Sequence, residues 1–144
     1  MSFLLFSMRL FLAMALQGAP DLAPAVAVDD DPIEVDLLYL TTIEYEEGTP
    51  LPAEIRELDG KKVFIWGWMS TDTLEGTTEF LLITDQCGCD GPPKLQHFVD
   101  VNMGDRVIGY RPEKIKVTGT FSVGELVEDD FVVSIYRLEA EDIE

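Results

Sequence analysis

The stretch KKVFIWGWMS, residues 61–70, is the strongest indication of fold class in the chain. It is rich in β-branched and aromatic residues, which favour strands over helices. Apolar side chains occupy both parities, so we expect a strand that is covered on both sides. Gly67 in its middle predicts a bend or a bulge, a feature that curls a sheet toward a barrel.

Strands are also predicted over residues 78–85, 95–103, 114–123 and 130–140. Residues 95–103 alternate, and one parity is mainly apolar: it holds Leu95, His97, Val99, Val101 and Met103. Residues 114–123 alternate as clearly, with one apolar set (Ile115, Val117, Phe121 and Val123) and one polar set (Lys116, Thr118, Thr120 and Ser122). Period-two alternation predicts one face toward a core and one toward solvent.

One short helix is expected before these strands, over residues 51–60, because Pro52 suits a first helical turn and Gly60 a helix end. Residues 36–48 fit either a short helix or an edge strand. No helical pattern separates the five strands, which argues against βαβ units. The prediction is an all-β domain with one short helix, a small five-stranded antiparallel OB-like barrel. A small β-sandwich is the alternative.

The chain of 144 residues carries 28 acidic and 10 basic residues, a formal net charge of −18. This length suits one domain, and an apolar content of 47% is enough for a hydrophobic core. Because such a charge repels phosphate backbones, nucleic acid is not an expected partner.

The N-terminus predicts export. Arg9 precedes the apolar run 10–16, and the small residues Ala25-Val26-Ala27 follow, the order found in a signal peptide. We therefore expect a signal peptide over 1–27, a flexible acidic lead-in over 28–36 and the barrel domain over 37–144. The apolar run is too short to span a bilayer, so the processed chain is expected in the periplasm or outside the cell.

Both cysteines and the only histidine lie within QCGCDGPPKLQH, residues 86–97. Two thiolates and an imidazole are ligands for zinc or copper, so Cys87, Cys89 and His97 are candidate metal ligands, with Asp90 or Asp85 as a fourth. A thiol–disulfide redox role is an alternative, because a bond across Gly88 would be strained and labile. A structural loop at the rim of an interaction module is the other alternative.

Aromatic residues on the first strand offer a second candidate site. Phe64, Trp66 and Trp68 share one parity and could form a stacking platform for a sugar or a peptide, unless the N-terminal segment covers them. The sequence contains no Ser-His-Asp, P-loop or dinucleotide motif. We therefore expect an exported, non-catalytic binding protein rather than an enzyme.

Three stretches together resemble the DUF3299 family of exported bacterial proteins: LPAEIRELDGKKVFIWGWM, EFLLITDQCGCDGPPKLQHFVDV and IKVTGTFSVGELVEDDFVVSIYRLEA. The similarity covers about residues 36–140. It implies a small OB-type barrel behind a signal peptide. Adjacent cysteines are frequent in the corresponding loop of the family, whereas Gly88 separates them here. Some relatives accompany metal-uptake transport systems, so the resemblance implies components of such a transporter, or another envelope protein, as partners.

Overall fold

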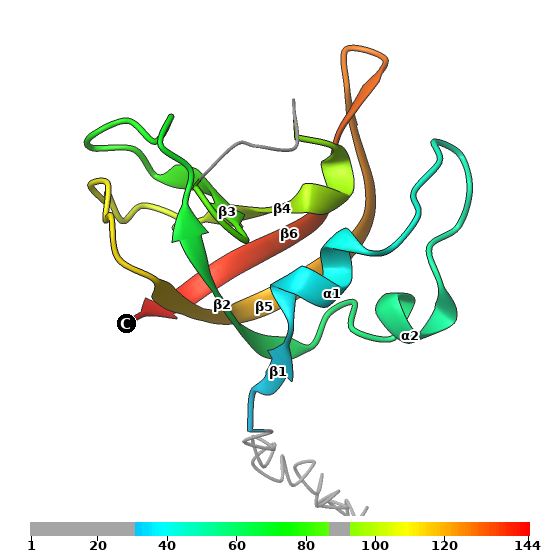
Figure 1. The fold of residues 1–144 in the computed structure, drawn as a ribbon, viewed down its shortest axis with the longest axis horizontal. Coiled ribbons are helices and arrows are strands. Elements are labelled where there is room, and N and C mark those ends of the chain that lie inside the picture. The colour runs from blue at the N-terminus through cyan, green and yellow to red at the C-terminus, as the bar shows by residue number, and fades with distance from the viewer. Residues whose placement is uncertain (1–30, 87–92) are drawn as a thin grey trace, which may run out of the picture.

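A computed structural model describes residues 31–86 and 93–144. The strands within these residues are β1 (Ile33–Val35), β2 (Lys62–Met69), β3 (Glu79–Ile83), β4 (Phe98–Asn102), β5 (Ile115–Glu128) and β6 (Phe131–Ile143). The helices are α1 (Leu37–Thr41), α2 (Ala53–Arg56) and the 3-10 helix η1 (Leu95–His97). Figure 1 shows the long β5–β6 hairpin projecting past the other strands, with α1 and α2 on one side of the sheet. The all-β class predicted from the sequence is confirmed.

The strands pair in the order β1-β2-β3-β4-β6-β5, and β5 also pairs with β2. The five strands expected from the sequence therefore form a closed cycle of neighbours. The prediction that all of them are antiparallel is wrong, because β4 and β6 run parallel. In a closed cycle, an odd number of strands cannot alternate in direction all the way around. One neighbouring pair must therefore be parallel.

The N-terminal part of the described chain differs from the prediction. Residues 33–35, expected within a flexible acidic lead-in, form a sixth strand, β1, which pairs in parallel with residues 63–65 of β2. Val35 is buried, and Asp36 caps α1 by accepting a 2.9 Å hydrogen bond from the Leu38 N–H to its Oδ1. The expected signal peptide, residues 1–27, lies outside the described residues.

Other expected elements differ in their bounds. The helix expected over 51–60 is the single turn α2. Within residues 36–48, for which a helix or an edge strand was expected, the structure has the helix α1, so its described residues hold two short α-helices rather than one. The strand expected over 95–103 begins only at Phe98, because residues 95–97 form η1. Gly67 lies where β2 changes partner, pairing with β1 through Ile65 and with β3 from Trp68 onward. No helix in the described parts of the chain is long and apolar enough to cross a bilayer.

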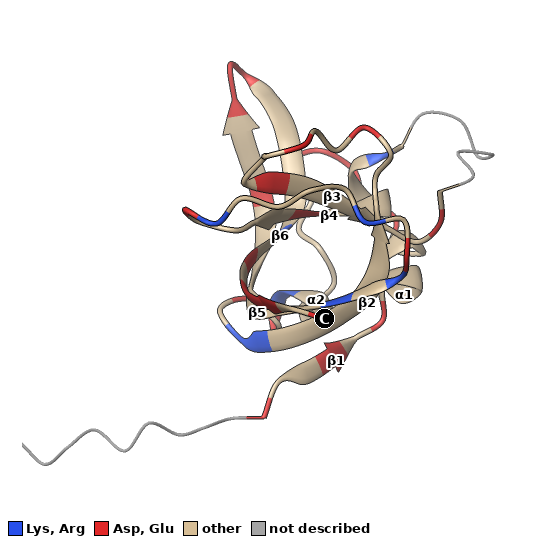
Figure 2. Cartoon of the chain, turned by 90° about the vertical axis from the view of Figure 1, so that its left-hand side faces the viewer, with Lys and Arg blue, Asp and Glu red and all other residues tan. Residues whose placement is uncertain are grey.

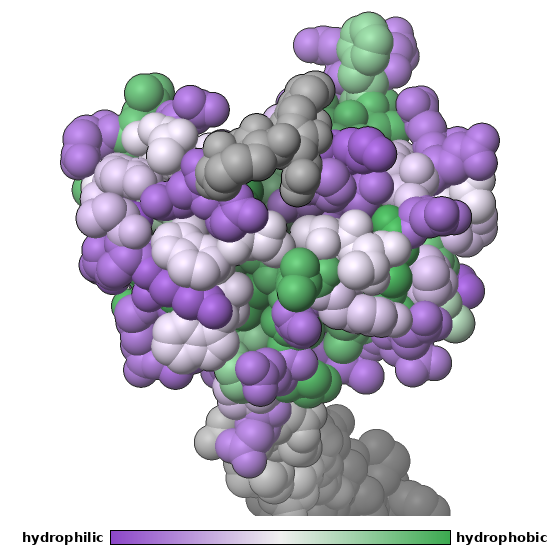
Figure 3. Space-filling view, viewed as in Figure 1, coloured by the Kyte–Doolittle hydropathy of each residue, from purple (hydrophilic) through white to green (hydrophobic). Residues whose placement is uncertain are grey.

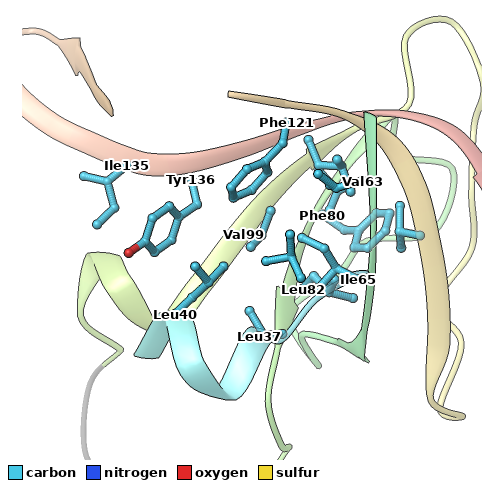
Figure 4. Packing of buried hydrophobic residues seen from close by; sticks show 14 of the residues in the cluster. Leu37, Leu40, Val63, Ile65, Phe80, Leu82, Val99, Phe121, Ile135 and Tyr136 are labelled. Carbon is cyan, nitrogen blue, oxygen red and sulfur yellow. The ribbon is translucent and has the colours of Figure 1, made fainter. Parts of the chain in front are cut away.

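The core lies inside the cycle of strands and is covered by α1. Figure 4 shows Leu37 and Leu40 on α1 pointing toward the side chains of the strands. A helix of five residues has no stability of its own in water, so burial of these two leucines keeps α1 in place. Residues with no exposed surface include Leu40, Val63, Ile65, Leu82, Val99, Val117, Phe121, Ile135, Tyr136 and Leu138.

Tyr136 carries a polar hydroxyl group into this core. Its ring stacks against Phe121 with centroids 6.0 Å apart, and its hydroxyl has no hydrogen-bond partner within the described part of the chain. Burial, followed by a smaller contribution from Tyr39, raises the pKa of Tyr136 from 10.0 to about 12. The phenol is therefore held neutral at a cost, because an unpaired buried hydroxyl is unfavourable by roughly 1–3 kcal/mol.

Tyr136→Phe is expected to raise the free energy of unfolding at neutral pH by about 1–2 kcal/mol, since the ring packing stays and the unpaired hydroxyl goes. The pKa in the folded state lies above the unfolded value, so the native protein should lose stability as pH rises from 10 toward 12. The variant should lose less over that range. Urea denaturation at pH 7, 10 and 11 measures both effects, and a less stable variant at pH 7 would contradict the prediction.

Candidate functional site

The outer face of β2 presents aromatic side chains. Val63, Ile65 and Met69 point into the core and are fully buried, whereas the alternate positions Phe64, Trp66 and Trp68 point outward. Trp66 keeps 43% of its surface exposed, and Phe64 and Trp68 are partly buried. Exposed indole surface is unfavourable in water, which makes this face a candidate for binding.

Lysines from β5 and the segment before it lie against these rings. Lys116 is the register partner of Trp66, and its Nζ lies 5.8 Å from the Phe64 ring centroid and 6.0 Å from that of Trp66. The Nζ of Lys114 lies 5.1 Å from the centroid of Trp68. These distances fall within the range of cation–π attraction, which favours contact between the ammonium groups and the rings.

The lysines on this face differ in their ionic partners. Lys116 forms an ion pair with Glu144, and Lys62 forms one with Glu141 at 2.8 Å. No carboxylate among residues 31–86 and 93–144 pairs with Lys114, whose side chain is exposed. Lys114 is therefore the ammonium group on this face that is available to a ligand.

A cleft of about 430 Å³ lies beside the two tryptophans. It lies where the chain passes from β1 into α1 and no longer pairs with β2. Thr84, the residue that follows β3, is part of its lining. Its lining consists of Glu34, Val35, Asp36, Leu37, Leu38, Trp66, Trp68, Thr84 and Lys114. Figure 3 shows apolar side chains gathered over α1 and the adjoining part of β2, with hydrophilic side chains around them. Such a mixed lining is typical of small-molecule sites.

The charges of the cleft are divided between its two sides. Glu34 and Asp36 come from the β1–α1 segment, and Lys114 comes from the β5 side of β2. One oxygen of Asp36 already accepts from the Leu38 N–H at the start of α1. Figure 2 shows acidic residues spread over most of the chain, including β1 and the tip of the β5–β6 hairpin. Lys114 is therefore a positive charge on a mainly acidic surface.

The predicted metal site is only partly described. Cys87, Cys89 and Asp90 lie outside the described residues. His97 ends η1 rather than lying on a strand, its backbone N–H donates to the Lys94 carbonyl at 2.9 Å, and its side chain is partly exposed. Within the described parts of the chain, no group of three His, Cys, Asp or Glu side chains could hold a metal ion.

The residue before the undescribed segment is held firmly. The Gln86 Nε2 donates to the Met69 carbonyl at 3.2 Å and to the Tyr110 hydroxyl at 2.8 Å. These contacts connect Gln86 to the end of β2 and to the loop before β5.

Two other hollows are polar or small. One of about 280 Å³ lies between residues 45–51 and the β5 bulge, where Tyr45 donates to Glu125 at 2.9 Å. Burial and that hydrogen bond raise the pKa of Tyr45 to about 12. The other, of about 420 Å³, contains Asp100, whose pKa is raised by burial and then by Glu79. Neither hollow combines exposed aromatic rings with a free cation.

A crystal structure of a DUF3299 family protein from Pseudomonas aeruginosa PAO1 is similar to this structure, with a TM-score of 0.50 and 20% sequence identity. The match covers 78% of this chain and 94% of that one. The chain has a DUF3299-like fold. The resemblance of the sequence to this family is thereby confirmed at the level of the fold.

A second solved structure is less similar to this chain. A putative aspartyl-tRNA synthetase from Leishmania major Friedlin aligns with a TM-score of 0.40 and 17% identity, over 84% of this chain and 22% of that one. That similarity is too low to support an argument. No protein-family model and no curated protein matches the chain.

The sequence of this DUF3299-like chain was sufficient to predict Trp66 and Trp68 as binding residues. It did not lead to a prediction of the charged residues around them. The alternation of residues 114–123 did contain a signal for Lys114, because it shares the outward parity of Lys116. Glu34 and Asp36 carried no such signal, since they fell in a segment expected to be flexible. Their place in the cleft depends on the pairing of β1 with β2.

Proposed function

We propose that this protein is a non-catalytic binding protein whose ligand occupies the cleft beside Trp66 and Trp68. One observation carries the proposal: an indole that is 43% exposed lies next to a second indole, an unpaired ammonium group and a cleft of about 430 Å³. Rigid aromatic side chains that remain exposed on a sheet provide binding energy at low entropic cost. Lysine ammonium groups already lie near both rings, 5.1 Å from the centroid of Trp68 and 6.0 Å from that of Trp66.

Binding without chemistry is the simpler role for this cleft. Among the described residues that line it, only Thr84 carries a hydroxyl group, and none carries an imidazole or a thiol. A serine or cysteine nucleophile next to a histidine base is thus not found among these lining residues. We therefore assign the lining residues to recognition of a ligand rather than to bond cleavage.

Intrinsic fluorescence provides a direct test, because Trp66 and Trp68 are the only tryptophans of the chain. We expect a saturable change in tryptophan emission when a panel of oligosaccharides and short peptides is titrated into the protein. The bound compound should be recovered intact, as shown by chromatography after a long incubation. No change with any probe would contradict the cleft as a binding site, and fragmentation of a probe would contradict the non-catalytic role.

Metal handling is a second proposed function, with Cys87, Cys89, His97 and Asp90 as ligands for zinc or copper. The supporting observation is that His97, which follows Cys89 by eight positions in the sequence, is partly exposed. Zinc and copper both accept this ligand set. If the protein is exported to the periplasm as its N-terminus predicts, metal-uptake transporters or other envelope proteins would be its partners.

Native mass spectrometry of the reduced protein tests the metal proposal. We expect one zinc or copper ion per chain and loss of that ion in His97→Ala. Gln96→Ala, which changes a neighbouring residue of η1, serves as the matched control and should keep the ion. A metal-free chain two hydrogens lighter before reduction would indicate a Cys87–Cys89 disulfide. If no ion bound after reduction, the metal proposal would fall and the redox or structural alternative would stand.

A further inference from the structure

The division of charge in the cleft limits the kind of ligand that fits it. Two carboxylates, Glu34 and Asp36, face the cleft from one side, and one ammonium, Lys114, faces it from the other. The lining therefore has no excess of positive charge, and the whole chain carries −18. An anionic ligand such as a polyphosphate or an acidic polysaccharide would gain one favourable contact and meet repulsion elsewhere.

A purely apolar ligand is also a poor match. It would bury the carboxylates of Glu34 and Asp36 and the Lys114 ammonium without supplying partners, and unpaired polar groups of this kind are costly to desolvate. A good ligand must therefore both donate hydrogen bonds to carboxylates and accept one from an ammonium group. Hydroxyl groups do both without carrying charge.

The aromatic side of the cleft adds a requirement for flat or weakly apolar faces. Trp66 and Trp68 are two residues apart on the same face of β2, so their Cα atoms are separated by about 7 Å along the strand. Two ring-shaped units of one ligand could each lie on an indole. A pyranose ring suits such a surface, because its C–H groups form an apolar face while its hydroxyl groups point outward to the walls.

We infer that the cleft binds an uncharged oligosaccharide, with sugar rings on Trp66 and Trp68 and hydroxyl groups bonded to Asp36, Glu34 and Lys114. This inference rests on the proposed function, since it names the ligand class of the same cleft. It also makes the acidic lining useful: carboxylates accept hydrogen bonds from sugar hydroxyl groups and repel competing anions. Because no ion pair forms, binding should change little with salt concentration.

Isothermal titration calorimetry with the full chain tests the inference, using cellohexaose, maltohexaose and chitohexaose as neutral probes and hexagalacturonate as the acidic one. At least one neutral probe is expected to bind, and more tightly than hexagalacturonate. Affinity should stay within about twofold between low salt and about 0.5 M sodium chloride. Trp68→Ala should weaken binding at least about tenfold, and Trp68→Phe should recover part of it.

Phe131→Ala is the matched control, because Phe131 is an aromatic side chain with 73% of its surface exposed on β6 and outside the cleft lining. Its affinity should equal that of the native chain. Stronger binding of hexagalacturonate, or an unchanged affinity in Trp68→Ala, would overturn the inference. If short peptides alter tryptophan emission and no neutral saccharide binds, the ligand class is wrong and the cleft remains a binding site. If no probe has any effect, the proposed function fails as well.

Discussion

Gly119→Ala is expected to lower the free energy of unfolding by about 3 kcal/mol or more, enough to unfold a large fraction of a marginally stable domain. Gly119 lies on β5 opposite Ala140 of β6, at a shift in the register of the pair. A Cβ atom added there would overlap the Glu139 carbonyl oxygen and lie 2.8 Å from its carbon and 2.9 Å from the Ala140 Cα. All three atoms belong to backbone, so the two strands would have to separate.

Gly109→Ala is the matched control for this steric effect. Its added Cβ would lie 2.5 Å from Oε2 of Glu75, which is the far end of a flexible side chain. That carboxylate can move away, so the change in stability should stay below about 1 kcal/mol. Urea denaturation followed by circular dichroism compares the two variants. Equal stability of Gly119→Ala and Gly109→Ala would show that the β5–β6 pair yields easily, contrary to this account.

Leu40→Ala has the second large expected effect, a loss of about 2–5 kcal/mol in the free energy of unfolding. Leu40 has no exposed surface and points from α1 toward the ring of Tyr136 (Figure 4). Its removal leaves a cavity between the helix and the strands. Because α1 is too short to be stable alone, the loss of this contact should also loosen the helix from the sheet.

Leu38→Ala makes the same chemical change two residues earlier in the same helix, where the side chain is 63% exposed. Both variants have nearly the same helix propensity, so the difference between them reports burial alone. Leu38→Ala should change stability by no more than about 0.5 kcal/mol. The two denaturation midpoints, measured side by side, give the comparison. A similar loss in both variants would mean that α1 contributes by helix formation and not by packing.

The loss of α1 packing should also change the shape of the cleft. Leu37 and Leu38 line it, and Asp36 is placed by its capping bond to α1. In Leu40→Ala at temperatures where the sheet remains folded, we therefore expect weaker ligand binding together with faster amide exchange in residues 36–42. The short helix thus links the stability of the core to the shape of the candidate site.

The alternation of residues 114–123 was sufficient to predict which side chains of β5 are buried, because a strand turns successive side chains to opposite faces. Ile115, Val117 and Phe121 lie in the core as expected, Val123 is only partly buried against it, and Lys116 lies outside. The all-β class followed from the same local periodicity. Trp66 and Trp68 were also found this way, since their parity opposes that of Val63, Ile65 and Met69.

Local periodicity determines the face on which a side chain lies, but it carries no information about the neighbouring strand. The closed cycle, the parallel β4–β6 pair and the strand β1 are set by contacts between residues far apart in the sequence. The cleft exists only because β1 leaves β2 before β3 joins it. The sequence by itself thus determined the strands and the aromatic face of β2. The tertiary structure decided that Glu34, Asp36 and Lys114 lie around this face, because only the pairing of distant segments brings these charges together.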